Sequence, residues 1–289
     1  MALAVLTAES AAAQQPSQPA AQNPSPMVEH TREHARLKQE SPPGRRETLG
    51  VGTLFLPAKL KLEAKTPLLV HFHGATWLSE VAADRLGGTA VISVQLGAGS
   101  AAYSKPFADP QSFAKLLTEA EAKAGVTFEP VTLSAWSAGY GSVREFLQVS
   151  KNYDRVTTVL LVDALHTGYV GGKPGPQEPQ LETDKLDVFL KFARDAAAGK
   201  KQMTITHSEI FPGTFASTTE TADYLIRELG LRRTAVLKWG PMGTQQLSEV
   251  RAGRFHVLGF AGNSAPDHVD HLHALPEFLK SLGAADPAR

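Results

Sequence analysis

Alternation of strand-like and helix-like segments is the feature that most limits how this chain can fold. Short apolar or β-branched runs bounded by Gly or Pro alternate with longer segments whose apolar residues recur at helical spacing. The run 155–165, RVTTVLLVDAL, is almost wholly apolar, as expected of a strand whose sheet is covered on both faces. The pattern therefore predicts an α/β fold: a mostly parallel twisted sheet with helices on both faces.

No internal repeat or second domain is evident, so residues 48–283 are predicted to form one domain, with 26–47 as a linker or N-terminal extension and 284–289 as a tail. The expected strands are 50–57, 67–74, 90–97, 130–137, 155–165, 202–210 and 255–262. The expected helices are 109–125, 138–150, 186–199, 217–229 and 267–282.

The first 25 residues differ from the rest in composition. A short apolar run leads to Ala-Ala-Ala and then to a stretch rich in Gln, Pro and Ser. This order is typical of a secretory signal cleaved near Ala13, although no Lys or Arg precedes the apolar run; a low-complexity tail is the alternative. We therefore expect an exported protein, periplasmic or secreted, and otherwise a cytoplasmic one.

Charge and hydropathy limit the classes of partner that the protein can bind. The chain has 29 basic and 29 acidic residues, so it carries no basic field for nucleic acid. No run reaches the roughly 18 apolar residues of a membrane span, and we expect no stable membrane insertion.

A serine stands where one expected strand ends, in TLSAWSAGYG (132–141). Sites in parallel sheets gather at the carboxyl ends of strands. A sharp strand-to-helix turn holds the Ser137 hydroxyl clear of the sheet and directs the next backbone N–H groups toward the same space, which suits a nucleophile and its oxyanion. Such a turn brings the backbone close to its neighbours, so Ala135 and Gly139, two residues to either side, must be small.

These residues resemble the α/β-hydrolase fold family. Its nucleophile elbow is G-x-S-x-G, and here the pattern is Ala135-Trp136-Ser137-Ala138-Gly139, with alanine for the first glycine. Upstream, His73-Gly74 ends its strand like the family's His-Gly oxyanion loop. The resemblance covers residues 48–283 and implies a serine esterase or lipase-like enzyme that needs no cofactor and no metal.

The resemblance also implies an oxyanion hole. The backbone N–H of Ala75, or of Thr76, would act with that of Ala138, while His73 would brace the loop by hydrogen bonding. His71, which alternates with His73, is expected to be a histidine on the face of the sheet. Three aromatic residues are expected near the site as the lining of an apolar acyl pocket: Trp77, Trp136 and Tyr140.

The remaining triad members have alternatives. His268, at the start of the last expected helix, is expected to be the general base, with His271 as its rival and a structural role for His273. Asp163 ends the apolar strand 155–165, where a carboxylate is costly unless it is paired, and is the expected acid. Glu209, which follows a later strand, is the alternative acid.

The resemblance implies hydrolysis of a carboxylic ester through an acyl-enzyme, with a small-molecule or polymer-borne ester as the substrate. The family's caps usually follow the strand that ends at Asp163, and the Gly/Pro-rich loop 166–180 is too short for a cap domain, so the cleft is expected to be open. Residues 211–213 and Phe215 are expected to form a second loop at the cleft mouth.

Two other functions are weighed against this one. His71 and His73, with the Asp267-His268 pair and its neighbouring histidines, suggest a metal-dependent hydrolase, but the spacing does not fit the usual zinc motifs. A hydrolase scaffold kept as a catalytically inactive binding protein is the other alternative.

Overall fold

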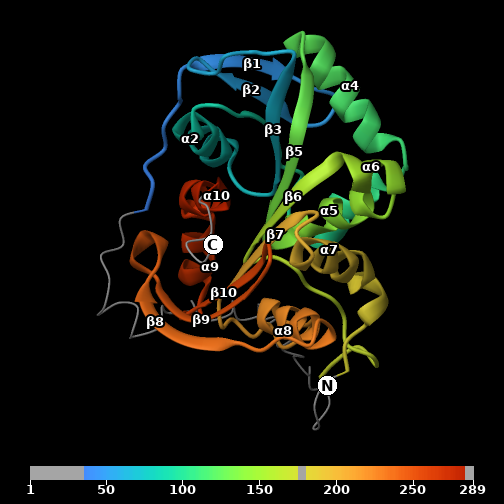
Figure 1. Ribbon diagram of the computed structural model, residues 1–289, viewed down its shortest axis with the longest axis vertical. Coiled ribbons are helices and arrows are strands. Elements are labelled where there is room, and N and C mark those ends of the chain that lie inside the picture. The colour runs from blue at the N-terminus through green and yellow to red at the C-terminus, as the bar shows by residue number, and fades with distance from the viewer. Residues whose placement is uncertain (1–35, 175–179, 284–289) are drawn as a thin grey trace, which may run out of the picture.

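The computed structural model describes residues 36–174 and 180–283 (Figure 1). The signal-like segment 1–25 and the tail 284–289 lie outside the described residues, as do residues 26–35 of the expected linker. Within the described ranges, no helix has the length and apolar character needed to cross a bilayer.

Ten strands of the described residues form one sheet, in the order β1-β2-β4-β3-β5-β6-β7-β10-β9-β8. The six central strands, from β4 to β10, are parallel, and antiparallel pairs close both ends. The fold class expected from the sequence is confirmed. The strands are β1 (Gly44–Thr48), β2 (Thr53–Pro57), β3 (Lys65–Phe72), β4 (Ala90–Val94), β5 (Thr127–Trp136), β6 (Val156–Val162), β7 (Gln202–His207), β8 (Thr234–Trp239), β9 (Gln245–Ala252) and β10 (Phe255–Phe260).

Helices connect the parallel strands and cover both faces of the sheet. They are α2 (Thr76–Leu86), α3 (Ser100–Ser104), α4 (Ser112–Ala124), α5 (Tyr140–Leu147), α6 (Ser150–Arg155), α7 (Asp187–Ala197), α8 (Thr218–Glu228), α9 (Ala265–His273) and α10 (Leu275–Gly283). Four short 3-10 turns are η1 (Lys105–Phe107), η2 (Ser137–Gly139), η3 (Thr183–Leu186) and η4 (Pro241–Gly243).

The core consists of two apolar layers, one on each side of the sheet. One layer joins the sheet to α4, α5, α7 and α8, and the other joins it to α2 and α10, as the two groups of helices in Figure 1 show. Of the seven β6 side chains, only that of Thr157 is exposed, which explains why the strand is so apolar. Both faces of the central strands are thus filled, and the strand ends are left for a site.

Several elements differ from the sequence expectation. Residues 44–47, expected to be linker, form most of β1 and pair with β2. β8, β9 and α2 were not expected, and the last expected helix is two helices, α9 and α10. β8 is an exposed edge strand, and an edge needs no apolar pattern because it packs on one side at most.

Candidate active site

Ser137 lies on the sharp turn between β5 and α5. Its φ is 48°, a left-handed conformation that is rare for a residue with a side chain and is found where function requires it. A Cβ at Gly139 would collide with the backbone carbonyl of Phe72 on β3. The structure therefore requires a small residue two positions after the serine, as the sequence predicts.

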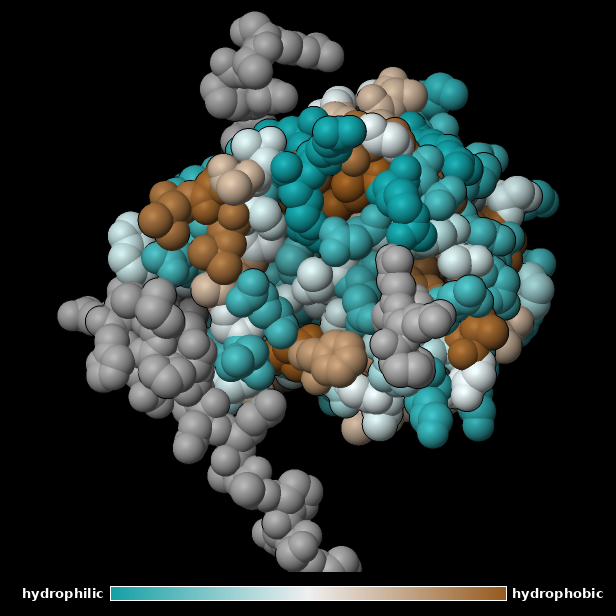
Figure 2. Space-filling view, turned by 90° about the horizontal axis from the view of Figure 1, so that it is seen from below, coloured by the Kyte–Doolittle hydropathy of each residue, from teal (hydrophilic) through white to brown (hydrophobic). Residues whose placement is uncertain are grey.

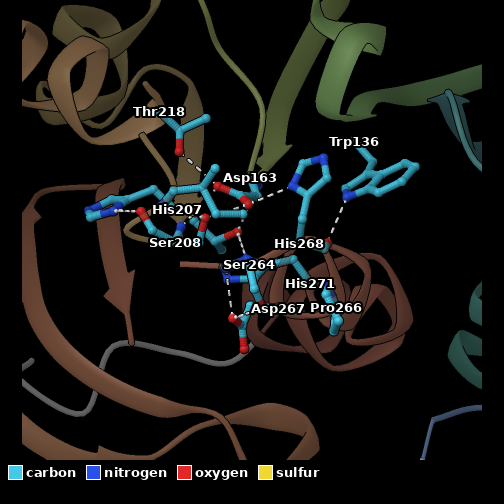
Figure 3. Close-up of polar contacts among 12 residues, drawn as sticks. Trp136, Asp163, His207, Ser208, Thr218, Ser264, Pro266, Asp267, His268 and His271 are labelled. Carbon is cyan, nitrogen blue, oxygen red and sulfur yellow. Dashed lines mark hydrogen bonds and ion pairs between the residues drawn. The ribbon is translucent and has the colours of Figure 1, made fainter. Parts of the chain in front are cut away.

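Asp163 follows β6, the strand next to β5, and also has a positive φ, 42°. Its carboxylate is 2% exposed and accepts four hydrogen bonds. Ser208 donates two, from its amide at 2.9 Å and its hydroxyl at 2.8 Å, and Thr218 Oγ1 donates a third at 2.7 Å. The fourth comes from His268 Nδ1, 2.6 Å from Asp163 Oδ2 (Figure 3).

These contacts keep the buried carboxylate charged. Burial by itself raises the pKa of Asp163, but the neighbouring His271 and His268 rings and the Ser208 amide outweigh burial and hold the pKa well below its usual range. A charged Asp163 accepts from Nδ1–H of His268, so Nε2 is the ring nitrogen that faces away from this hydrogen bond.

His268 is placed by the first turn of α9. A capping box between Ser264 and Asp267 starts this helix, with the Ser264 hydroxyl 2.6 Å from the Asp267 carboxylate. Two rigid elements, α9 and the end of β6, thereby bring together residues 105 positions apart in the chain.

Trp136 stacks between two histidine rings. Its ring centroid lies 4.6 Å from that of His268 and 4.9 Å from that of His73, with interplanar angles of 29° and 15°. The indole Nε1–H also donates to the His268 backbone carbonyl at 3.0 Å, so Trp136 contacts both the ring and the main chain of this histidine (Figure 3). Trp136 was expected to line an acyl pocket; its position favours holding His268 in place.

The expected oxyanion loop lies between β3 and α2. His73 has a φ of 71°, and its Nδ1 shares a hydrogen bond of 2.7 Å with the Tyr103 hydroxyl, as expected for a brace. The Gly74 amide donates to Gln95 Oε1 at 2.8 Å. Ala75 is exposed and is the N-cap of α2. The helix therefore begins at Thr76, directly after this loop.

Ser137 opens onto a cleft with two lobes. The large lobe, about 650 Å³, is lined by residues that include His73, Ala138, Tyr140, Arg144 and Lys185. The small lobe, about 240 Å³, is lined by residues that include Asp163, Ile210, Pro212, Ala265 and His268. Both lobes share Ser137, His166 and Phe215. Figure 2 views the molecule from the end at which α8 lies, where hydrophobic side chains are recessed between hydrophilic ones.

His166, at the junction of the lobes, is a site residue that the sequence did not indicate. Its Nδ1–H donates to the Ala216 carbonyl at 2.9 Å, and burial lowers its pKa, so the ring is neutral. Its Nε2 has no partner among residues 36–174 and 180–283 and is an acceptor in the cleft wall. The only signal in the sequence is its place three residues after Asp163, at the start of a loop.

Other expected residues lie elsewhere. Trp77 makes an edge contact with His273, 5.8 Å between ring centroids, and does not line either lobe, which corrects its expected place in an acyl pocket. His271 is buried, with Nδ1 3.0 Å from Thr206 Oγ1, and Glu209 is exposed at the surface. These positions favour His268 and Asp163 over the two alternatives.

Ser137 and His268 line the small lobe together, but in the described part of the chain no hydrogen bond joins the Ser137 hydroxyl to the histidine ring. Such bonds often tighten only when substrate binds.

The histidines suggested as metal ligands have separate partners. His71 Nδ1 lies 3.1 Å from Ser134 Oγ, His73 contacts Tyr103, and His268 contacts Asp163. Within the described ranges, no group of three or more His, Cys, Asp or Glu residues could hold a metal ion.

Comparisons with known proteins show likeness in structure alone. No family model and no curated protein matches the chain. A cold-adapted esterase from an Arctic intertidal metagenomic library is 14% identical, with a TM-score of 0.45 over 84% of this chain and 96% of its own. A thermophilic esterase from the Planctomycetes species Thermogutta terrifontis is 15% identical, with a TM-score of 0.46 over 86% and 96%. A feruloyl esterase module from Clostridium thermocellum is 14% identical, with a TM-score of 0.47 over 89% and 99%.

This chain's own sheet places a serine on a strand-to-helix turn, an aspartate after the neighbouring strand and a histidine in the helix after the last strand, which is the arrangement expected from the sequence. The chemistry of the site is inferred from the residues of this chain.

Proposed function

We propose that this protein is a serine hydrolase that cleaves carboxylic esters through an acyl-enzyme. Ser137 is the nucleophile, His268 the general base and Asp163 the acid that fixes the histidine tautomer. The observation that carries the proposal is the 2.6 Å bond between His268 and the buried Asp163, at the edge of a cleft onto which the strained Ser137 opens.

The reaction has two balanced halves. In the first, Ser137 Oγ bonds to the ester carbonyl carbon as its proton passes to His268 Nε2; the bond to the alcohol oxygen then breaks, and that oxygen takes the proton. In the second, water gives a proton to Nε2 and its oxygen bonds to the acyl carbon, after which Oγ leaves and recovers the proton.

Backbone amides stabilise the negative oxygen in both halves. The Ala138 amide directly follows the nucleophile, and Ala75 or Thr76 supplies the second donor from the loop that His73 braces. Charged Asp163 stabilises the imidazolium that forms on His268.

Hydrolysis of p-nitrophenyl acetate tests this function. We expect Ser137→Ala to lower kcat by about 10⁴-fold or more, because no other group can form the acyl-enzyme. Ser150→Ala, an exposed serine on α6, is the matched control and should keep wild-type activity. A chelator should have no effect. Full activity in Ser137→Ala would rule the proposal out, and loss of activity with chelator would favour the metal alternative.

A further inference from the structure

The two lobes of the cleft hold different parts of the ester. The histidine that takes the serine proton must return it to the departing alcohol oxygen, so that oxygen has to lie beside His268. His268 lines the small lobe and is not among the residues that line the large one. The alcohol therefore occupies the small lobe, and the acyl chain extends into the large lobe past Ala138.

The small lobe suits a small apolar alcohol. Beyond the polar residues around Asp163, its walls are the apolar side chains of Ile210, Pro212, Phe215 and Ala265. Its volume is about 240 Å³, against about 650 Å³ for the large lobe. The bulk of the substrate must therefore be on the acyl side.

The large lobe carries two cations. Arg144 projects from α5, one turn after Tyr140, and Lys185 from η3, so the charges come from separate segments. No Asp or Glu is among the described residues that line this lobe. Two cationic side chains in a lining without a carboxylate offer hydrogen-bond donors to an anionic group on the bound molecule.

Each cation is ion-paired with a neighbouring glutamate, yet neither uses all of its hydrogen-bond donors in that pair. Arg144 is 17% exposed and directs Nε and Nη2 to Glu145 Oε1, at 3.3 and 3.1 Å, which leaves Nη1 without a partner in the described part of the chain. Lys185 bonds to Glu182 with a single one of its three N–H groups. Each therefore keeps donors for a carboxylate.

We propose that the substrate is an ester of a small apolar alcohol with an acyl chain that ends in a carboxylate, which Arg144 and Lys185 bind in the large lobe. This assignment rests on the proposed function, because His268 defines the alcohol side.

The assignment is tested by measuring the initial rates at which matched esters are hydrolysed. The acid released in each reaction is measured by pH-stat titration. The anionic substrates are the monomethyl dicarboxylates from succinate to suberate, and each is compared with the neutral ester in which an amide replaces the free carboxylate. We expect kcat/KM to be about 10- to 100-fold higher for the best anionic ester than for its amide, the range that charge-assisted hydrogen bonds supply. Acetate esters of ω-hydroxy acids, which carry the carboxylate on the alcohol side, should be poor substrates.

Substitutions test whether Arg144 and Lys185 cause the preference for the anionic ester. The double variant Arg144→Gln, Lys185→Gln should bring the ratio of the anionic ester to its amide close to one. Lys200→Gln is the matched control, since Lys200 is exposed and precedes β7, at the opposite ends of the strands; its ratio should equal that of wild type.

The outcomes separate the two proposals. Hydrolysis that depends on Ser137 but shows no preference for the anionic ester, or a preference unchanged in the double variant, overturns the substrate assignment and leaves the proposed function standing. Preference for the acetates of hydroxy acids overturns the assignment of the lobes. If no ester is hydrolysed in a Ser137-dependent way, the proposed function fails and this inference fails with it.

Discussion

Two residues hold His268, the proposed general base, through three contacts. Asp163 accepts from Nδ1 of His268, Trp136 stacks on its ring, and the Trp136 indole donates to its backbone carbonyl. Since a displacement of about 1 Å in a catalytic group costs about 100-fold in rate, contacts that fix the ring matter as much as the ring itself.

Substitution of Trp136 tests its positioning role. Trp136→Phe keeps an aromatic ring against His268 but removes the indole donor, and we expect kcat to fall by about 3- to 10-fold. Trp136→Leu removes the stacking as well and should lower kcat by about 100-fold. KM should change little in both, because Trp136 does not line either lobe. Steady-state kinetics would contradict this role if KM rose while kcat stayed unchanged, as expected for a wall of the acyl pocket.

The sequence could indicate those site residues whose type is unusual for the place where they stand in the chain. Ser137, Asp163 and His268 each combine a reactive group with a break in a strand or helix pattern. Trp136 was expected near the site, but as a pocket wall, and His166 was not expected there; stacking on one ring and access to a cleft wall depend on which segments fold together.

At the scale of elements, the turn between β5 and α5 is tightly constrained. A side chain at Gly139 would meet the backbone of Phe72, and backbone atoms cannot move aside as a flexible side chain can.

Gly139→Ala should therefore destabilise the protein by about 1–3 kcal/mol and lower activity, because the turn must open to make room for a methyl group. Gly88→Ala is the control, because a Cβ there meets nothing within 4 Å. Urea unfolding measures the free energy of unfolding of both variants. Equal stabilities for the two variants would show that the close approach at Gly139 is not required.

Buried parallel strands were predictable because both of their faces are apolar. β1 and β8 were missed because edge strands keep exposed, mixed sequences: every β8 residue except Val236 is exposed. The division between α9 and α10 falls at Ala274, within a segment that reads as one amphipathic helix, and only tertiary packing shows that the chain breaks there.

For the whole molecule, buried neutral histidines set the response to acid. Burial lowers the pKa of His71 and of His207 from 6.5 to about 4. Between these values the unfolded chain binds protons that the folded chain does not, so their stabilising contribution is complete above pH 6.5 and is lost as the pH falls toward 4.

Urea unfolding between neutral pH and pH 4 should show this loss, up to about 3 kcal/mol for each ring. His207→Gln and His71→Asn should each flatten the dependence on pH, because each removes a group that titrates differently in the folded and unfolded states. A free energy of unfolding that stays constant from neutral pH to pH 5 would contradict the burial of these rings.

The most direct measurement is covalent labelling of the intact protein with a fluorophosphonate, followed by peptide mass mapping. We expect one adduct per chain, on the peptide that contains Ser137, appearing in parallel with the loss of ester hydrolysis and absent from Ser137→Ala. An adduct on another residue, or hydrolysis that continues after Ser137 is fully labelled, would contradict the assignment of Ser137 as the nucleophile.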